Sequence, residues 1–597
     1  MKIEKIEIKN FRNFESLEVE VGEQIVIIGE NKVGKSNFLY ALRLLLDPSL
    51  PEAARYLSDV DFWDGIKRPI TNQEIVISVE FTGFDDNKDL LCIFANCLVN
   101  AKPLTARITY IYYPKKTKQE KAEYEYAIYG GKDVKNRLSY EIRKAIPFEI
   151  LPALRDAESD LSNWGKSPLK PLIERITKKI DRLQLEKISD DMSKVTDKLR
   201  ENQQIINLSK DINNQLEELV GANHMIDTSL GFNPTDPDRI FRSIKMLIDD
   251  GKRGISEASQ GSANLLYLVL KTLELKFLVH DGSRDHTFLA IEEPEAHLHP
   301  HVQRLVYKYL LKKTRNSEIK DKLNEEFTSI LTTHSPHIAS VSPLKSFVVL
   351  KKVESLKKTE GISTKNLDIT EKEVKDLERY INVTRGEILF AKGVILVEGD
   401  AEETLVPVLA SQNNYFLDEL GITICSVSGT NFAPYVKLLG KKGLDIPFSI
   451  ITDFDPQGGG KEPLSNNRIK KLLQEVMPKV ELEKYKDKDE ELISKSSEYG
   501  IFRNTHTFEI DLFKNGGALA MTESIKELTE VKIAEARAEK WYANKSIDKE
   551  EKRFLDDIEK IGKGRFAQRV ATNIVLKNQK ALPVYIKEAI EYVSSRI

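Results

Sequence analysis

The 597-residue sequence predicts an α/β protein with two successive parts. Two observations lead to this prediction. In the first part, the apolar stretch 25–28 reads as a strand that ends in the glycine-containing sequence GENKVGKS at 29–36, after which a helix begins. In the second part, the apolar stretch 393–397 ends in a group of acids, and a helix follows again. Strands that alternate with helices in this way build parallel sheets.

The composition is typical of a globular protein with ample core, since 41% of the residues are apolar and 31% are charged. The 90 basic and 93 acidic residues leave a formal net charge of −3, which excludes a basic surface over the whole molecule but not a local basic groove. Three cysteines without a CxxC pair exclude a disulfide framework. The N-terminus lacks an apolar signal core, and no run of about 18 apolar residues occurs. We expect a cytoplasmic protein without a membrane segment.

Further elements follow in order along the chain. Strands are predicted at 2–9, where apolar and charged residues alternate, and at 19–21, 24–28, 75–81 and 106–113, with a helix at 37–46. Residues 160 to about 225 are polar with apolar residues at helical spacing, which predicts either a solvated helical insertion or a dimerisation arm. We therefore predict one domain formed by 1–159 and 230–375, a helical insertion at 160–229, and a second domain at 385–597 that ends in helices.

The stretch 29–36 fits the pattern G-x4-G-K-[ST] of a phosphate-binding loop. Its position between a strand and a helix matters, because backbone N–H groups at the helix start can then surround phosphates. Lys35 is expected to reach the β- and γ-phosphates of ATP, and Ser36 to bind Mg²⁺. The predicted ATP-binding residues of this loop are Gly29, Asn31, Gly34, Lys35, Ser36 and Asn37.

The partner motif of this loop, an acidic strand end, lies roughly 260 residues later. The apolar stretch 288–291 ends in Glu292 and Glu293, and we predict that Glu292 binds Mg²⁺ while Glu293 orients or deprotonates the attacking water. The alternative is that these acids only begin a helix. A further strand, 328–333, ends near His334, which is placed like a histidine that senses the γ-phosphate.

The stretch SEASQG at 256–261 precedes a long apolar helix and resembles a degenerate signature motif of ATP-binding-cassette proteins. In those ATPases this helix start faces ATP bound by a second subunit, so Ser259 and Gly261 would complete the nucleotide site across a homodimer. The alternative is a purely structural loop. His297, His299 and His301 are expected to support the dimer interface rather than a metal.

The acids after the strand 393–397 have two possible roles. Glu398 falls at the carboxyl end of a parallel strand, where open α/β sheets place ligands. Asp400 and Glu403 have the spacing of a capping box and are predicted to start the helix. Capping does not need Glu398 or Glu402, so these two are left for a ligand.

A second strand, 446–452, ends in Asp453-Phe454-Asp455. Residues two apart on a strand point the same way, which predicts that Asp453 and Asp455 face the same side. Carboxylates from two neighbouring strand ends would repel one another without a cation, and oxygen ligands of this kind suit Mg²⁺ or Mn²⁺. The alternative is that these are unrelated surface acids.

Two resemblances follow from these motifs. IEIKNFRNFESLEV at 6–19, followed by the phosphate-binding loop, resembles the N-terminus of RecF- and SMC-like cassette ATPases. The pattern E-G-x-x-E with the later D-x-D resembles the topoisomerase–primase (Toprim) signature. In this order the two resemble the OLD (overcoming lysogenization defect) family of ATP-dependent nucleases, to which the nuclease subunit of Gabija phage defence belongs. The implied fold is an ABC- or SMC-like P-loop ATPase with a helical insertion, followed by a Toprim α/β domain.

The resemblance also implies roles for particular residues. SGTNF at 428–432 matches a glycine-bearing turn, and TFEIDLF at 507–513 resembles a later acidic strand with Glu509 as the metal ligand and Asp511 as the second choice. KGRFA at 563–567 resembles a motif whose lysine takes part in cleavage. The implied metal ligands are Glu398, Glu402, Asp453, Asp455 and Glu509, with Lys563 as a catalytic residue.

The function expected from this set is an ATP-regulated DNA endonuclease that hydrolyses phosphodiesters with two metal ions about 4 Å apart. DNA, a homodimer or higher oligomer, phage defence and an associated helicase are expectations of the resemblance. One rival is a topoisomerase- or primase-like Toprim enzyme, for which Tyr435 is the nearest candidate nucleophile. The other is a RecF- or SMC-like scaffold ATPase.

Overall fold

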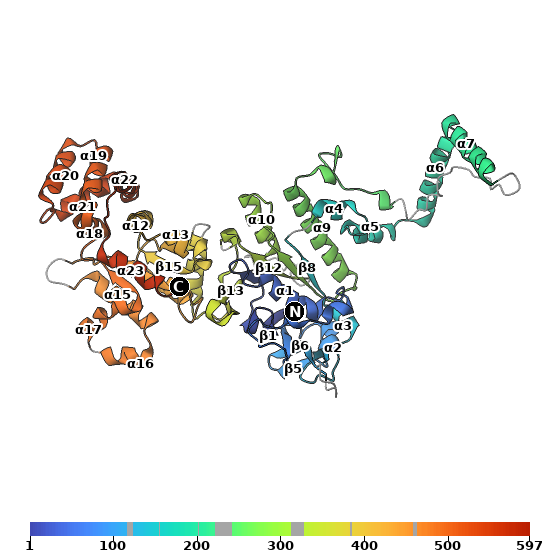
Figure 1. The fold of residues 1–597 in the computed structure, drawn as a ribbon, viewed down its shortest axis with the longest axis horizontal. Coiled ribbons are helices and arrows are strands. Elements are labelled where there is room, and N and C mark those ends of the chain that lie inside the picture. The colour runs from blue at the N-terminus through green and yellow to red at the C-terminus, as the bar shows by residue number, and fades with distance from the viewer. Residues whose placement is uncertain are drawn as a thin grey trace.

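The computed structural model describes residues 1–115, 123–153, 156–200, 202–220, 241–311, 327–338, 340–381, 385–457, 462–486 and 488–597. Figure 1 shows an N-terminal part in blue and green beside a C-terminal part in yellow to red, with a helical arm that projects from the N-terminal part. No helix within these ranges is long and apolar enough to cross a membrane.

The chain begins with an antiparallel sheet in the order β2-β1-β4-β6-β5, and β7 pairs with β6. Its strands are β1 (Lys2–Phe11), β2 (Phe14–Glu20), β4 (Ile75–Thr82), β5 (Leu98–Ala101), β6 (Leu104–Pro114) and β7 (Tyr124–Gly130). Ile6 and Ile8 of β1 are fully buried, while Glu7 between them stays partly exposed, as the alternation predicted. The buried face packs on α1 (Lys35–Leu46).

A second sheet has the order β14-β13-β3-β12-β11-β8 and is parallel except for β14. Its strands are β3 (Ile25–Ile28), β8 (Phe148–Leu151), β11 (Thr287–Glu292), β12 (Phe327–Thr333), β13 (Phe347–Val353) and β14 (Lys358–Ser363). Helix α1 covers one face, while α9 (Gln260–His280) and α10 (Pro300–Leu310) cover the other. All four residues of β3 are therefore buried. Strands from before and after the helical insertion thus form one sheet.

The segment after β8 is helical, as expected for the insertion. It contains α4 (Ala157–Ser162), α5 (Leu169–Thr177), α6 (Arg182–Arg200) and α7 (Gln203–Val220), and α6 and α7 form the projecting arm in Figure 1. Residues 221–229 of the predicted insertion, and residues 230–240 at the predicted start of the second segment of the first domain, lie outside the described residues. The remaining elements of this part are α2 (Lys88–Phe94), α3 (Tyr140–Ala145), β9 (Leu247–Ile248), β10 (Arg253–Gly254) and α11 (Glu371–Tyr380).

The C-terminal part is built on a parallel sheet in the order β16-β15-β17-β18. The strands are β15 (Gly393–Val397), β16 (Ile422–Ser426), β17 (Phe448–Thr452) and β18 (Ile501–Arg503). Val394 and Leu396 pack on the side of α14 (Ala433–Leu439) and α15 (Leu464–Val476). Ile395 and Val397 pack on the side of α12 (Asp400–Gln412) and α23 (Val584–Ser594). The sheet is thus covered on both faces, which leaves its edges for function.

A helical bundle lies between β18 and α23 in the chain and packs on α12. It consists of α18 (Phe508–Leu512), α19 (Ala518–Leu528), α20 (Lys532–Asn544), α21 (Glu551–Ile561) and α22 (Lys563–Leu576); short helices α13 (Leu417–Leu420), α16 (Lys479–Leu482) and α17 (Asp489–Ser494) lie outside it. Trp541 and Phe554 form its centre, with ring centroids 5.5 Å apart. The bundle brings the start of α22 to the sheet.

An ion pair with a buried carboxylate in this bundle provides a test of its packing. Asp557 is 4% exposed, and its carboxylate accepts hydrogen bonds of 2.6–3.0 Å from the Arg537 guanidinium. Because Asp557→Ala leaves that guanidinium without its partner, we expect the free energy of unfolding to fall by about 3 kcal/mol. Urea unfolding followed by tryptophan fluorescence measures it. Asp556→Ala, at an exposed neighbour, should change stability by less than about 0.5 kcal/mol, and equal effects of both variants would contradict the prediction.

Candidate functional sites

The phosphate-binding loop joins β3 to α1 and is braced by a residue that the motif does not contain. The Asn13 side chain donates a hydrogen bond of 2.8 Å to the carbonyl oxygen of Val33. Gly34 has φ +100°, and a Cβ at this position would lie 2.1 Å from Nδ2 of Asn13. Only glycine fits there, for both reasons. The stretch NFRNF, which carried a family resemblance, therefore also has a structural role.

Lys35 lies over the loop, and its ammonium group donates hydrogen bonds to the carbonyl oxygens of Gly29 (2.9 Å) and Glu30 (3.0 Å). Burial lowers the pKa of Lys35 to about 8, although the negative charges of Glu292, Glu293 and Glu295 oppose that change. A cavity of about 410 Å³ opens beside the loop and is lined by Gly29, Glu30, Asn31, His334, Pro336, Glu387 and Phe390. A phosphate entering here would meet the Lys35 ammonium group, whose positive charge the nearby carboxylates balance only in part.

The strand ends that carry Glu293 and His334 lie together, because β11 and β12 are parallel neighbours. Glu292 ends β11, and Glu293 follows it with φ +43°. The Glu293 carboxylate lies 3.5 Å from Nε2 of His334, which follows β12 directly. Burial lowers the pKa of His334, and Lys35 lowers it further. The structure thus brings Lys35, Glu293 and His334 to one edge of the sheet.

Glu295 was not assigned a role from the sequence, yet it fixes this edge. Its carboxylate accepts hydrogen bonds from the hydroxyls of Tyr307 and Thr333, both at 2.7 Å, and from the backbone N–H of His334 at 3.1 Å. It therefore positions the strand end that carries His334. The signal in the sequence was the third acid of EEPE, which a two-acid motif leaves unused.

The other predicted ATP-binding residues differ in their exposure and in their contacts within the chain. The Asn37 amide is held by Arg12 at 2.8 Å and Asn13 at 2.6 Å, and Ser36 is exposed at the loop. Ser259 caps α9 by accepting a hydrogen bond of 3.2 Å from the N–H of Ser262. A Cβ at Gly261 would lie 2.7 Å from the carbonyl oxygen of His297. Close packing within one chain thus accounts for Gly261, and contacts of Ser259 and Gly261 with a second subunit stay a prediction.

The second site lies at the carboxyl edge of the C-terminal sheet, where five acids come together. We call Glu398, Glu402, Asp453, Asp455 and Glu509 the acidic centre. Glu398 follows β15, and its Oε1 accepts hydrogen bonds from the Thr452 hydroxyl (2.5 Å) and the backbone N–H of Asp453 (3.0 Å). Glu402 and Glu509 are 8% and 6% exposed. The Lys563 ammonium group lies 3.4 Å from the Glu509 carboxylate.

Burial and mutual repulsion dominate the electrostatics of this centre. Burial raises the pKa of Asp453 to about 8, and the charges of Glu402, Glu398 and Glu509 add to it. For the same reasons the pKa of Glu402 rises to about 7. Burial alone would lower the pKa of Lys563, but Glu509, Asp453 and Glu402 raise it. Carboxylates that repel one another in a buried place suit a divalent cation as their common partner.

Protein cations already contact part of this set. Arg468 of α15 donates to the carboxylates of Glu398 and Asp455, the latter at 2.8 Å, and Lys563 pairs with Glu509. Within the described ranges, no three His, Cys, Asp or Glu side chains are arranged as a ready metal site. The donor atoms thus fit a divalent ion chemically, but a bound ion would have to draw them closer together.

Three local predictions about this site are wrong. Asp400 and Glu403 form no capping box: Gly399 is the N-cap residue, and Glu403 instead accepts a hydrogen bond of 3.3 Å from the N–H of Ser426 in β16. Asp453 and Asp455 do not alternate along a strand, because β17 ends at Thr452 and Asp455 has φ +49°.

The third error concerns 507–513, which forms helix α18 rather than a strand. On a helix, residues two apart point in different directions. Glu509 accordingly meets Lys563, whereas Asp511 accepts hydrogen bonds of 2.6 Å from the N–H and hydroxyl of Thr505. The helix therefore separates the two acids that the resemblance left as alternatives.

No sequence motif marks Asn504 or Arg468, yet both contact the acidic centre. Asn504 is 3% exposed; its amide donates to the Asp453 carboxylate and accepts a hydrogen bond of 2.7 Å from the N–H of Phe454. It follows β18 directly, so the rule that polar residues at strand ends hold ligands could have found it. Arg468 lies in α15, and no local pattern distinguishes it.

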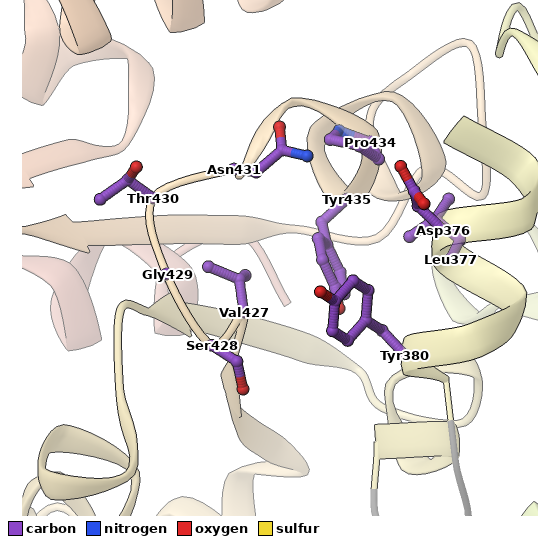
Figure 2. Close-up of a pocket in the computed structure, with 10 residues that line it drawn as sticks. All are labelled: Asp376, Leu377, Tyr380, Val427, Ser428, Gly429, Thr430, Asn431, Pro434 and Tyr435. Atoms are coloured by element: carbon purple, nitrogen blue, oxygen red, sulfur yellow. The ribbon is translucent and has the colours of Figure 1, made fainter. Parts of the chain in front are cut away.

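The glycine-bearing turn at 428–432 lies against the acidic centre on one side and a pocket on the other. The N–H of Gly429 donates 2.8 Å to the carbonyl oxygen of Glu398. Figure 2 shows the pocket, of about 220 Å³, with Tyr435 reaching into it from α14 and Tyr380 from α11. Tyr435 is 2% exposed, and its hydroxyl has no hydrogen-bond partner among the described residues. Burial raises its pKa, so Tyr435 is poorly suited to be a strand-cleaving nucleophile.

Comparisons with known proteins agree with this arrangement. A family model described as AAA ATPase domain matches residues 1–339, and one described as Overcoming lysogenization defect protein-like, TOPRIM domain, matches residues 389–455. Endonuclease GajA of Bacillus cereus (strain VD045) is 23% identical over 576 residues, 89% of this chain and 92% of that protein. The OLD nuclease of Thermus scotoductus is 24% identical over 76% of this chain and 82% of that protein.

Among solved structures, the C-terminal region of the Burkholderia pseudomallei OLD protein is 39% identical to this chain. The match covers 35% of this chain and 98% of that one, with a TM-score of 0.31. The two family models confirm the predicted order, a P-loop ATPase followed by a Toprim domain.

The raised pKa values predict how stability depends on pH in the metal-free protein. In the unfolded chain, Asp453 and Glu402 lose their protons near pH 4, but in the folded chain only near pH 8 and pH 7. Between these values the unfolded chain binds fewer protons, so the free energy of unfolding should fall as pH rises from about 5 to 8. Asp453→Asn should remove most of this fall and stabilise the protein at pH 8 by roughly 2 kcal/mol.

Urea unfolding at pH 5 and pH 8 in the presence of a chelator measures this effect. Asp400→Asn is the matched control, because Asp400 is exposed at the start of α12 and should leave the fall in place. If Asp453→Asn keeps the full pH dependence, the cause lies outside the acidic centre.

Proposed function

Since an AAA ATPase domain is followed by an OLD-like TOPRIM domain, this chain belongs to the OLD family, and we propose that it is a divalent-metal-dependent DNA endonuclease governed by ATP. The observation that supports cleavage most directly is the acidic centre with Lys563 beside it. Relatives that match over most of their length are named endonuclease GajA and OLD nuclease. A nuclease that also hydrolyses ATP is the activity common to these features.

The chemistry of the centre suits phosphodiester hydrolysis. Glu402, Asp453 and Glu509 would hold a divalent ion, which when bound supplies a water of lowered pKa and neutralises charge on the phosphate. Asp453 and Glu402 would release their protons on binding, so their raised pKa values make ion binding dependent on pH. The Lys563 ammonium group, about half exposed at the start of α22, is placed to stabilise negative charge that develops on the phosphate or leaving oxygen.

Control by ATP is supported by contacts between the nucleotide cavity and the strand that carries Glu398. Glu387 and Phe390 line that cavity, and both lie a few residues before β15. The Lys392 ammonium group, next to β15, lies 3.7 Å from the carboxylate of Glu30 in the phosphate-binding loop. A change in the loop on nucleotide binding would therefore act on the segment that leads to the acidic centre.

We propose that two copies of the chain enclose ATP, with Ser259 and Gly261 of one copy facing the loop of the other. A role in phage defence and a helicase partner stay expectations of the family resemblance.

The nuclease proposal predicts the outcome of a plasmid assay. With Mg²⁺ or Mn²⁺, the purified chain should nick or cut supercoiled DNA, and Asp453→Ala should reduce the rate by about a hundredfold or more, because the charge-bearing metal ligand is lost. Asp400→Ala, which removes an exposed carboxylate from the same edge of the domain, should keep the rate. Religated topoisomers in place of nicked or linear product would support the topoisomerase rival, and ATP hydrolysis without cleavage would support the scaffold rival.

The nucleotide site is tested separately. Lys35→Ala should weaken ATP binding by roughly 30-fold, because a buried charged donor to the phosphates is lost. Fluorescence anisotropy with a labelled ATP analogue measures this, and Mn²⁺ binding at the acidic centre should be unchanged. Lys32→Ala is the control, since Lys32 is an exposed lysine of the same loop. If both lysines weaken binding equally, the motif assignment of Lys35 fails.

A further inference from the structure

The pocket in Figure 2 contains a polar group for which the chain provides no partner. Tyr435 is 2% exposed, and its hydroxyl has no hydrogen-bond partner among the described residues. Tyr435 reaches into the pocket from the start of α14, and Tyr380 reaches into it from the end of α11. Buried hydroxyls are normally hydrogen-bonded, so a molecule that enters the pocket has to supply the partner.

The pocket lies at the same edge of the C-terminal sheet as the acidic centre. One of its walls is the turn 427–431, which follows β16, and the N–H of Gly429 in this turn donates 2.8 Å to the carbonyl oxygen of Glu398. Asp453 follows β17, which is separated from β16 only by β15. Neighbouring strands are about 4.8 Å apart, so the ends of β16 and β17 are roughly 10 Å apart, or about three nucleotides of a stacked DNA strand at about 3.4 Å each.

The size and lining of the pocket favour a small, flat, uncharged ligand. Its volume of about 220 Å³ is below the roughly 300–1,000 Å³ of pockets for drug-sized ligands, so it suits one ring system rather than a whole nucleotide. Its ten lining residues include no Lys, Arg or His, and Asp376 among them would repel a phosphate. The Tyr380 ring offers a stacking surface, while the Asn431 amide and the Tyr435 hydroxyl supply hydrogen-bond donors and acceptors. A nucleobase combines these properties.

A cation lies beside the pocket, where the phosphate of such a ligand would be placed. The Arg385 guanidinium donates 2.6 Å to the Ser428 hydroxyl and lies 6.0 Å from the centroid of the Tyr380 ring. A Cβ at Gly429 would meet nothing within 4 Å, so the space beside the turn is open. A base could therefore enter past the turn while its phosphate stays outside, near Arg385.

We propose that this pocket binds one nucleobase. The base comes from the DNA strand at the acidic centre or from a free nucleoside, since both present the same ring to Tyr380 and the same polar edge to Tyr435. In DNA it would be a base about three nucleotides from the phosphate that is cut, which would make Tyr435 a residue that selects the substrate. The DNA source rests on the proposed nuclease function, but the test measures binding and needs no cleavage.

The test compares the binding of two single strands of equal length to the full chain in the presence of a chelator. One strand is oligodeoxyadenylate and the other is abasic, so they share their phosphates and differ only in their bases. Fluorescence anisotropy should show that the strand with bases binds roughly tenfold more tightly, because one base is stacked. Tyr435→Phe should lower this ratio about fivefold, because a hydrogen bond to the base is lost, and should leave the affinity for the abasic strand unchanged.

Two further variants control for the fold and for the position of the hydroxyl. Tyr435→Phe keeps the ring and removes a hydroxyl that has no hydrogen-bond partner among the described residues, so the protein should stay folded. Tyr380→Ala, at a position that is 41% exposed, should remove most of the preference for bases. Tyr140→Phe, which removes an exposed hydroxyl from α3, should keep the full ratio.

Competition with adenosine distinguishes the two sources of the base. If adenosine displaces oligodeoxyadenylate from the wild-type chain but not from Tyr435→Phe, the pocket takes a free nucleoside. If the Tyr435-dependent preference persists in excess adenosine, the pocket takes a base of the DNA strand.

An equal ratio of the two affinities in the wild-type chain and in Tyr435→Phe would overturn the proposal and leave water as the partner of the hydroxyl. Failure of the nuclease proposal is distinguishable. A Tyr435-dependent preference for bases without plasmid cleavage would keep the pocket and reject the activity, whereas plasmid cleavage without this preference would do the reverse.

Discussion

Repulsion among buried carboxylates at one edge of a parallel sheet is the constraint on which the C-terminal part depends. Asp453 and Glu402 lie close enough, and buried enough, that both hold their protons well above the ordinary range. Arg468 from α15, Asn504 after β18 and Lys563 from α22 each contact one or two acids of the acidic centre. Helices from distant parts of the sequence are thus needed at this edge. The same negative charge that lowers the stability of the fold makes this edge a suitable site for a cation.

The nucleotide site and the acidic centre are parts of one continuous structure. A single apolar cluster runs from β3, β12 and β13 through Leu377 and Ile388 to Val394 of β15. The segment before β15 lines the nucleotide cavity, and Glu398 follows the strand directly. A packed core resists gradual deformation, so movement at the loop would be passed on as a shift of whole elements. This provides a physical route by which ATP could govern the second site.

Much of the fold and part of each site followed from local patterns. Apolar runs bounded by glycine or acids predicted β3, β11, β15 and β17, because parallel strands are buried on both faces and must be apolar throughout. The errors were also local. Glu403 accepts a hydrogen bond from β16 instead of capping its own helix, and Asp455 lies beyond the end of β17 with a left-handed backbone. For Glu403, a contact with a residue distant in sequence outweighed a local preference of about 1 kcal/mol.

The sequence by itself determined that two strand-end sites exist, one suited to phosphates and one to a cation, because the motifs at 29–36 and 398–455 are local and their chemistry depends on residue type. Tertiary structure alone decided which cations contact the acids and which acids lie close enough to raise one another's pKa. Arg468, Asn504 and Glu295 are ordinary residues in their own segments and gain their roles only where strand ends converge. Electrostatic interaction depends on distance and burial in space, and neither is written in the spacing of residues along a chain.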